Sequence, residues 1–356
     1  MRLDCYQDAL GFDLLKQEWD ELLWRSSTNT VFLTCDWQRA WWRHFGKDKA
    51  LQLLAMRDGN GSLAAIVPLF IHDTPLDPSS ALPYINVENA VPVAGSEVHR
   101  VVHLVGGSEV SDYLDIIAPP EFTRQACATL LDFLAERQGW QALDLRSLPA
   151  GSPTAGALAE LAESRGWSVQ VGREDVCPVL VLPDTWDGYL TDRLDKKKRH
   201  ELRRKMRKAE RETNVHWYWG EEQEPEQALQ IFFELHRASD PEKDAFMSER
   251  MEGFFRDVAQ AARQRGWLRL AIMRFDGQAV ASYLCFDYNS DRLVYNSGFD
   301  LSTYGALSPG IVLLGYVIED TIQAACRHLD FLQGDERYKY DLGATDTEVK
   351  RLFIRR

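Results

Sequence analysis

The chain has 356 residues, of which 45% are hydrophobic and 27% are charged. These proportions are typical of a globular protein and exclude a disordered, collagen-like or disulfide-scaffold chain. The 54 Asp and Glu residues outnumber the 41 Lys and Arg residues, so the formal net charge is -13, which disfavours a whole-surface attraction to nucleic acid or anionic lipid. The length is about twice that of a typical domain and predicts two domains.

Localisation and metal content follow from what the sequence lacks. No apolar stretch reaches the roughly 20 residues of a membrane span, and residues 1–7 have no signal-peptide core, so we expect a cytoplasmic protein without a membrane span. The six cysteines include no CxxC pair, and neither a zinc site nor a disulfide framework is expected. His99 and His103 have the spacing of metal ligands but no third ligand nearby, so we expect no metal.

The first half of the chain predicts two helices, a hairpin, and then a strand, a helix and a returning strand. Apolar residues recur at helical spacing in the first two segments, and Thr34 precedes the second as a helix cap. Glycines separate the two hairpin strands. The predicted elements are helices over 12–25 and 34–45, hairpin strands over 51–56 and 62–71, a strand over 113–117, a helix over 122–137 and a strand over 142–145.

The second half repeats this arrangement. Its predicted elements are hairpin strands over 268–274 and 278–286, a strand over 292–297, a helix over 309–326 and a strand over 329–332. Both hairpins begin alike, with LLAMR at 53–57 and LAIMR at 270–274. Such a repeat predicts a mixed α/β fold of the α+β type, with two tandem domains that are each a mainly antiparallel sheet flanked by helices. Prolines interrupt any helix between 172 and 187, so we divide the chain into domains 1–175 and 176–356.

Segment 190–212 is an electrostatic exception in this acidic chain, because it holds eleven Lys or Arg residues and five acidic residues. Leucine and methionine residues fall on one i+4 line, which predicts a single basic helix that rests on the protein through a thin apolar stripe. A solvated charged face is one interpretation of this helix. The other is that some of its outward cations, Lys197, Arg203, Arg204 and Arg207, bind the phosphates of a cofactor, a nucleotide-linked acceptor or RNA.

The start of the predicted helix at 309 is a second candidate. Ser308 is suited to cap the helix and Pro309 to occupy its first position. Gly310 leaves out a side chain where free backbone N–H groups and the positive end of the helix dipole face outward, so a pyrophosphate can approach. The same residues also make an ordinary helix entry, and that alternative stays open.

The strand-end turn at 330–339 is a third candidate because it is dense in titratable side chains. Lys339 can stabilise an oxyanion, Asp335 or Glu336 can take a proton from an attacking amine, and Tyr338 can give one to a leaving group. A solvated loop is the alternative.

With these residues identified, the chain resembles the CelD-like (BioF-like) acetyltransferases of the GNAT superfamily, which are related to the Fem-type peptidyltransferases built from two GNAT domains. The motifs that carry the resemblance are KR at 198–199, KAE at 208–210, LH at 235–236, DGQAVA at 276–281, YNSGFD at 295–300, LSPG at 307–310 and LDFLQGDERYK at 329–339. His236 in the LH motif at 235–236 is a further catalytic candidate.

The resemblance implies an acyl-CoA site. In GNAT enzymes the turn that precedes the helix after the central strand holds the CoA pyrophosphate, and the matching residues here are Leu307, Ser308, Pro309 and Gly310. The usual Gln/Arg-x-x-Gly-x-Gly/Ala loop is absent, and Fem-type relatives place aminoacyl-tRNA there instead. The matching position of the first half is Ala118-Pro119-Pro120, where a proline pair removes amide donors, so we expect the N-terminal domain to be non-catalytic.

The function that the resemblance implies is N-acyl transfer, in which an acyl group, typically acetyl, passes from acyl-CoA to an amine. A small-molecule or nucleotide-linked acceptor is expected, such as an amino sugar or an envelope or exopolysaccharide precursor, and no DNA partner. One alternative is a Fem-like transferase that uses aminoacyl-tRNA. Another is a non-enzymatic module that binds polyanions through 193–211.

Overall fold

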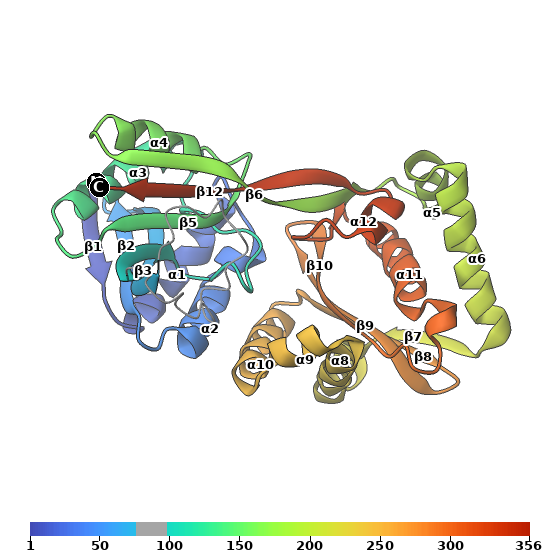
Figure 1. Cartoon of the computed structure of the whole chain (residues 1–356). Helices are drawn as coiled ribbons and strands as arrows, with labels where there is room; N and C mark the ends of the chain where they lie inside the picture. Colours follow the sequence, from blue (N-terminus) through green and yellow to red (C-terminus); the bar gives the residue numbers. More distant parts are fainter. Residues whose placement is uncertain (76–97) are drawn as a thin grey trace. The chain divides into compact units, whose positions relative to one another are not determined.

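The computed structural model describes residues 1–75 and 98–356 (Figure 1). The chain divides into two compact units, Met1–Asp175 with Glu348–Arg356, and Val176–Thr347. The first crossing between units therefore lies where the sequence analysis put the domain boundary. The expected end of the second domain at residue 356 is wrong, because the last strand returns to the first unit and pairs there with the strand that ends at Pro149.

The first unit contains a mainly antiparallel sheet with helices packed in pairs. Its strand order is β1-β2-β3-β4-β5-β12-β6. Strands β4 and β5 pair in parallel, whereas β1 with β2, β2 with β3, β3 with β4, and β5 with β12 pair antiparallel. The two expected helices, the Thr34 cap and the hairpin are confirmed. The elements are β1 (Arg2–Tyr6), α1 (Leu10–Trp24), α2 (Cys35–Phe45), β2 (Ala50–Arg57), β3 (Leu63–Pro75), β4 (Val98–Leu104), α3 (Pro120–Ala135), β5 (Ala142–Pro149), α4 (Thr154–Glu163), β6 (Ser168–Val181) and β12 (Thr345–Arg355).

The strand expected over 113–117 is wrong. Leu114 N–H donates to Ser147 O of β5 at 2.9 Å, whereas Ile117 pairs with Ile66 of β3 through a single bridge. The segment therefore passes from one strand to another and runs along neither.

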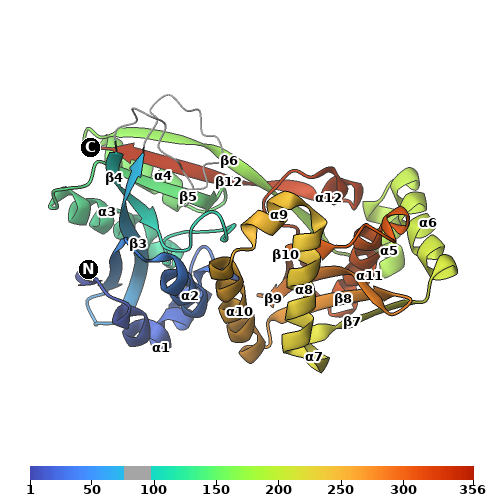
Figure 2. The ribbon, with the colours of Figure 1, turned by 60° about the horizontal axis from the view of Figure 1, so that its bottom comes forward.

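The second unit holds a sheet of strand order β6-β11-β10-β9-β8-β7. Helices α8, α9 and α10 cover one part of this unit, and α6 packs with α11 (Figure 2). The second expected hairpin is confirmed. The elements are α5 (Trp186–Gly188), α6 (Lys196–Glu212), β7 (Val215–Trp219), α7 (Gly220–Gln223), α8 (Pro225–Ser239), α9 (Pro241–Phe246), α10 (Glu249–Gln264), β8 (Leu268–Phe275), β9 (Gln278–Tyr288), β10 (Asp291–Phe299), α11 (Pro309–Gln323), β11 (His328–Asp330) and α12 (Arg337–Asp341).

Strand β6 runs to Val181 through the segment where prolines were expected to interrupt any helix, and Pro178 O accepts a hydrogen bond there from Phe331 N–H at 3.0 Å. One expectation at the start of this unit is wrong. The basic helix begins at Lys196 rather than at residue 190, because Asp195 adopts an extended backbone and its carboxylate accepts the Lys198 N–H at 2.8 Å. A separate π-helical turn, Tyr189–Arg193, precedes it.

Strands β10 and β11 separate partway along β10. Strands β10 and β11 run in parallel but pair only from Asp291 to Leu293 of β10, although β10 continues to Phe299 along β9. A bulge between Val294 and Asn296 marks the point of divergence. The C-terminal part of β10 therefore has no neighbouring strand on its β11 side.

Helix α6 packs on α11 through a small residue. A Cβ added to Gly315 of α11 would lie 3.0 Å from Met206 Sδ, and the α6 residues Leu202 and Ala209 are buried in the same apolar core as α11. This contact fixes which face of the basic helix turns toward α11. Among the described residues, no helix combines the length and the apolar character needed to cross a membrane.

The returning strand β12 joins the first unit through a buried ion pair. Arg351 of β12 donates two hydrogen bonds to the Asp144 carboxylate of β5, at 2.5 and 2.9 Å, and Arg146 adds a contact at 3.3 Å. Burial alone raises the pKa of Asp144, but Arg146 and Arg351 outweigh it and hold the pKa below its usual value.

Replacing Arg351 by Leu should destabilise the first unit by about 3 to 5 kcal/mol, because a buried carboxylate then loses its main partner. Urea unfolding followed by tryptophan fluorescence measures the loss. Arg355→Leu on the same strand is the control, since the Arg355 side chain covers the Phe353 ring, and should cost about 1 kcal/mol or less.

The stabilisation by a carboxylate with a lowered pKa is present above its unfolded pKa and is lost in acid, so the difference in unfolding free energy between wild type and Arg351→Leu should shrink below about pH 4. Equal losses in the two variants would contradict the role of the ion pair.

Candidate active site

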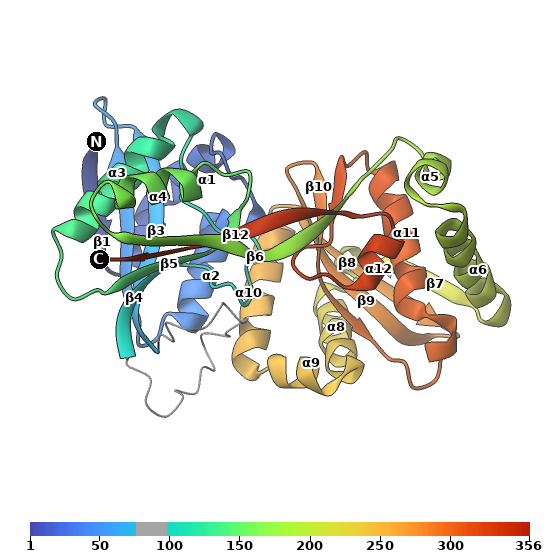
Figure 3. The ribbon, with the colours of Figure 1, turned by 45° about the horizontal axis from the view of Figure 1, so that its top comes forward.

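Helices α6, α11 and α12 belong to the second unit (Figure 3). Residues of all three helices line a groove. It has a volume of about 350 Å³, which is in the range of small-molecule sites. We call it the α6–α11 groove. Its lining residues are Asp195, Lys197, Lys198, Glu201, Leu202, Lys205, Ile311, Arg337, Tyr338, Asp341 and Leu342.

The N-terminus of α11 opens on this groove through Ile311. The first backbone hydrogen bond of the helix joins Val312 N–H to Ser308 O at 3.1 Å, so the N–H groups of Gly310 and Ile311 precede the helical hydrogen-bond ladder. Pro309 has no N–H. Ile311 brings the positive end of the helix dipole to the groove, whereas Leu307, Ser308, Pro309 and the buried Gly310 are not among its lining residues.

The reasons given from the sequence for Ser308 and Gly310 are wrong in detail. Ser308 has a left-handed backbone, with φ of 53°, and its side chain makes no capping hydrogen bond. A Cβ on Gly310 would lie 2.6 Å from Cε1 of Phe299, so the missing side chain makes room for an aromatic ring rather than for a ligand. Tyr283 O–H also donates to Gly310 O at 3.3 Å. The helix start is therefore held rigidly from the sheet side.

Two lysines of α6 supply positive charge to the groove, which is also lined by Asp195, Glu201 and Asp341. Lys198 is engaged, because its ammonium donates to Tyr340 O at 2.8 Å. Among the described residues, Lys197 and Lys205 form no direct ion pair, and the neighbouring Glu201 is bound by Arg204 at 2.7 Å. The groove thus combines the N-terminus of α11 with two lysines that have no direct carboxylate contact, which suits an anion.

Of the catalytic candidates in the strand-end turn, Tyr338 lines the groove. Its ring packs edge-on against Phe331, with 6.1 Å between centroids. Burial, and next the charge of Glu336, raise the pKa of Tyr338. The hydroxyl therefore stays protonated at neutral pH and can donate a proton or a hydrogen bond.

Lys339 has a different role from the one expected. Its side chain is buried, and its ammonium donates to three backbone carbonyls, Leu332 O at 3.1 Å, Gln333 O at 2.8 Å and Gly334 O at 3.0 Å. It also forms an ion pair with Glu336 at 2.9 Å. An ammonium has three N–H donors, so none remains for an oxyanion, and Lys339 instead holds the turn in shape.

Asp335 and His236 are not at the groove. Asp335 is exposed and does not line it. His236 of α8 is buried, and its backbone lies so close to β10 that a Cβ on Gly298 would be 2.3 Å from His236 N. Burial, with a further contribution from Lys243, lowers the pKa of His236 to about 4. Neither residue contacts the start of α11.

The predicted phosphate-binding arginines lie on a different face of α6. They belong to a basic surface that we call the α6 outer face. Its residues are Lys196, Arg199, His200, Arg203, Arg204, Arg207, Lys208 and Arg211. Arg204 is held by Glu201, and Arg203 lies 3.6 Å from Asp187. This surface therefore differs from the groove in both position and residues.

Sequence reasoning missed Lys205, Arg337 and Ile311 as groove residues. Lys205 follows Lys198 by two helical turns, so a helical projection places both on one face. Ile311 directly follows the SPG motif but has no polar group to attract notice. Arg337 has a side chain that is 91% exposed, and nothing in its sequence context distinguishes it from other surface arginines.

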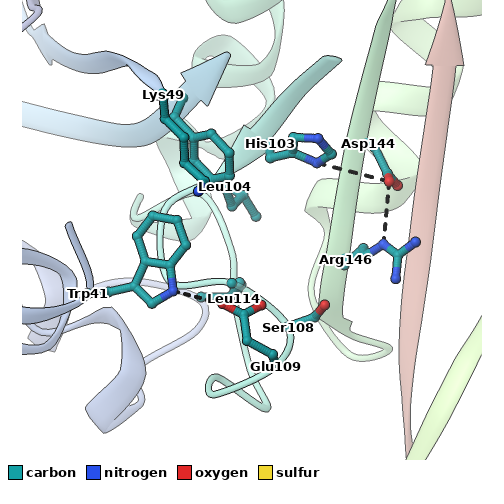
Figure 4. A pocket seen from close by; sticks show the side chains of 11 residues that line it. Trp41, Lys49, His103, Leu104, Ser108, Glu109, Leu114, Asp144 and Arg146 are labelled. Carbon is teal, nitrogen blue, oxygen red and sulfur yellow. Dashed lines mark hydrogen bonds and ion pairs between the residues drawn. The ribbon is translucent and has the colours of Figure 1, made fainter. Parts of the chain in front are cut away.

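The first unit has a smaller hollow of about 40 Å³ beside Trp41, His103 and Arg146 (Figure 4). Trp41 Nε1–H donates to Glu109 at 3.1 Å, and Asp144 lies between His103 and Arg146. Burial lowers the pKa of His103 to about 4, so it is neutral near pH 7. The hollow has room for a few waters only. In the described parts of the chain, no group of three or more His, Cys, Asp or Glu residues is placed to hold a metal.

Comparison with known proteins gives a family and a fold. Residues 196–340 match the family model described as an acetyltransferase (GNAT) domain, whereas no curated protein matches. The crystal structure of FemX superposes with a TM-score of 0.63 at 11% identity, covering 99% of this chain and 97% of that chain. The L-PGS structure from Bacillus licheniformis gives a TM-score of 0.54 at 9% identity, covering 94% and 90%.

These likenesses are structural, since the identities are low. They agree with the expected mixed α/β fold of two tandem GNAT-like domains. The family match includes α6, the start of α11 and the strand-end turn, and thus the groove residues other than Asp195, Asp341 and Leu342. Residues 196–340 therefore match the model of the GNAT acetyltransferase domain, and the chain as a whole has a fold similar to that of FemX.

Proposed function

We propose that this protein is an N-acyltransferase that binds acyl-CoA, typically acetyl-CoA, in the α6–α11 groove and transfers the acyl group to an amine. The observation that carries the proposal is the groove itself. It joins the N-terminus of α11, through Ile311, to the lysines Lys197 and Lys205 of α6, which together suit a pyrophosphate. The turn at 307–310 is where the family resemblance places that group.

The chemistry requires an attacking amine, a thioester and a proton for the leaving thiolate. The amine nitrogen attacks the carbonyl carbon, and the tetrahedral intermediate then collapses and expels the thiolate without a covalent enzyme adduct. The nitrogen loses one proton and the sulfur gains one. Tyr338 is the relay in this proposal, because it lines the groove and is protonated: it gives its proton to the thiolate and regains the proton that the nitrogen loses. Positioning of the two substrates supplies much of the rate.

The α6 outer face is the proposed binding surface for a phosphorylated acceptor, such as a nucleotide-linked amino sugar or envelope precursor. Arg203, Arg204 and Arg207 are its arginines nearest the middle of α6. The first unit is proposed to be non-catalytic. Its helix α3 begins at Pro120 directly after Pro119, so it offers fewer amide donors than α11.

The same basic surface favours a second candidate, in which the donor is aminoacyl-tRNA or the chain only binds polyanions. The two readings differ in ligand. Under the acyltransferase proposal, acetyl-CoA raises the melting temperature and bulk tRNA binds weakly. Tight tRNA binding that falls steeply with salt, together with no response to acetyl-CoA, supports the second candidate instead.

Ile311→Asp should weaken acetyl-CoA binding about tenfold or more, because a carboxylate then faces the pyrophosphate at the helix N-terminus. Isothermal titration calorimetry measures the affinity. Ile311→Asn is the matched control, since it removes the same apolar contacts without adding charge. An acidic residue in a first helical turn is favourable for the helix, so Ile311→Asp should melt no lower than Ile311→Asn. Equal acetyl-CoA affinity in the two variants would remove the α11 N-terminus from the donor site.

The double variant Lys197→Glu, Lys205→Glu should lower acetyl-CoA affinity by about 100-fold or more, since two charged contacts are lost and each is worth about 1.5 to 3 kcal/mol. The control is Arg203→Glu, Arg207→Glu, which changes the net charge by the same amount on the α6 outer face and should leave acetyl-CoA affinity within about threefold. Titration calorimetry at two salt concentrations separates local contacts from general attraction. If both double variants lose affinity equally, binding depends on the overall charge of α6 and not on the groove.

A further inference from the structure

Lys243 of α9 is a mostly buried lysine at the end of the central strand β10. Its ammonium donates to Ser297 O at 2.8 Å and to Ser297 Oγ at 3.3 Å. Burial lowers the pKa of Lys243. The charge is therefore held away from solvent at the part of β10 that has no neighbouring strand on its β11 side.

Two of its three N–H donors are engaged, and the third has no acceptor among the described residues. No described carboxylate forms an ion pair with Lys243 either. The acidic residues that act on it from a distance are Asp240 and Glu336. Asp240 accepts the backbone N–H of Lys243 at 2.9 Å as the cap of α9, and Glu336 is paired with Lys339 at 2.9 Å. A buried cation with a free donor is costly unless a partner is supplied.

Lys243 is linked to the donor groove through a single side chain. Its ammonium lies 5.5 Å from the centroid of the Phe299 ring, and the same ring contacts Gly310 at the start of α11. The neighbouring Phe299 N–H donates to Ser239 Oγ at 2.8 Å. Helices α8 and α9 thus bring polar groups to the free edge of β10, while the groove lies beyond the other side of Phe299.

We propose that Lys243 is a catalytic residue of this acyl transfer, whose free N–H donates to the acyl oxygen as it becomes negative. The inference rests on the proposed function. When the amine nitrogen bonds to the carbonyl carbon, the C=O π electrons move onto oxygen, and the Lys243 ammonium stabilises that oxyanion without giving up its proton. The C=O bond re-forms as the C–S bond breaks, the thiolate takes a proton, and Lys243 is unchanged.

The comparison with Lys339 separates a catalytic from a structural lysine in the same unit. Lys339 is saturated by three carbonyls and a carboxylate, whereas both acceptors of Lys243 belong to one residue, Ser297. Of these two lysines, Lys243 is the one that keeps an N–H donor for a ligand.

Reductive methylation with formaldehyde and borohydride, mapped by mass spectrometry on the full chain, tests the position of Lys243. At acetyl-CoA about tenfold above its dissociation constant, modification of Lys243 should slow about tenfold, since only the free protein reacts. The exposed Lys47 of the first unit is the control and should react at an unchanged rate. Acetyl-CoA that raises the melting temperature but leaves Lys243 modification unchanged would overturn this inference and leave the proposed function intact. Acetyl-CoA that does neither would overturn the proposed function and the inference with it.

The catalytic step is tested with Lys243→Met and Lys243→Arg. Lys243→Met should keep acetyl-CoA affinity within about threefold yet lower the release of CoA thiol from acetyl-CoA, with water as acceptor, by about 100 to 1000-fold. Lys243→Arg keeps a cation and should recover part of the rate that Lys243→Met loses. A purely structural role, in which Lys243 only binds Ser297, does not predict a change in rate while acetyl-CoA affinity stays constant. Thiol release that exceeds the buffer rate in the wild type and persists in Lys243→Met would contradict the role.

Discussion

The contact between the Phe299 ring and Gly310 determines the geometry on which the site depends. The ring fills the space that a side chain at position 310 would need, and so fixes the end of β10 against the start of α11. Tyr283 supports the same junction, because its ring packs on Phe299 at 5.6 Å and its hydroxyl bonds to Gly310 O. Ile311 of α11 thereby lines the groove, while the Lys243 ammonium lies 5.5 Å from the centroid of the same Phe299 ring.

The rotation of α6 about its own axis, rather than the overall composition, determines which basic side chains lie on which surface. The chain carries a net charge of -13, yet α6 presents two distinct basic surfaces. Packing of Met206 against Gly315 sets the rotation of α6, so Lys197 and Lys205 face the groove while Arg203 and Arg207 belong to the outer face. A shift of the apolar stripe by one residue would exchange the two sets.

Elements whose conformation depends on neighbouring residues in the sequence could be predicted from the sequence. The turn at Asp276 and Gly277 has φ of 49° and 87°, and both residues are of the type that tolerates such angles, so the second hairpin is visible in the sequence. The repeat, the boundary near 175 and the start of α11 are likewise visible. The return of β12 to the first unit is not, because the partner that holds Arg351 is Asp144, far away in the sequence.

The catalytic roles expected for Lys339 and His236 were wrong for the same reason. Lys339 looks like a free cation until the left-handed Leu332 and Gly334, with φ of 58° and 109°, fold three carbonyls back onto it. His236 looks accessible until Gly298 lets α8 approach the sheet backbone. Sequence motifs identify the segments that form the groove, whereas the saturation or availability of each polar group depends on backbone directions that no motif specifies.

Hydrogen–deuterium exchange of the full chain with and without acetyl-CoA tests the central claim most directly. The account predicts slower exchange in two segments together, the start of α11 with its Gly310 and Ile311 amides and the half of α6 that faces it, while β12 and the first unit stay unchanged. Acetyl-CoA binding that protects other segments and leaves residues 307–312 unchanged would contradict the assignment of the donor site.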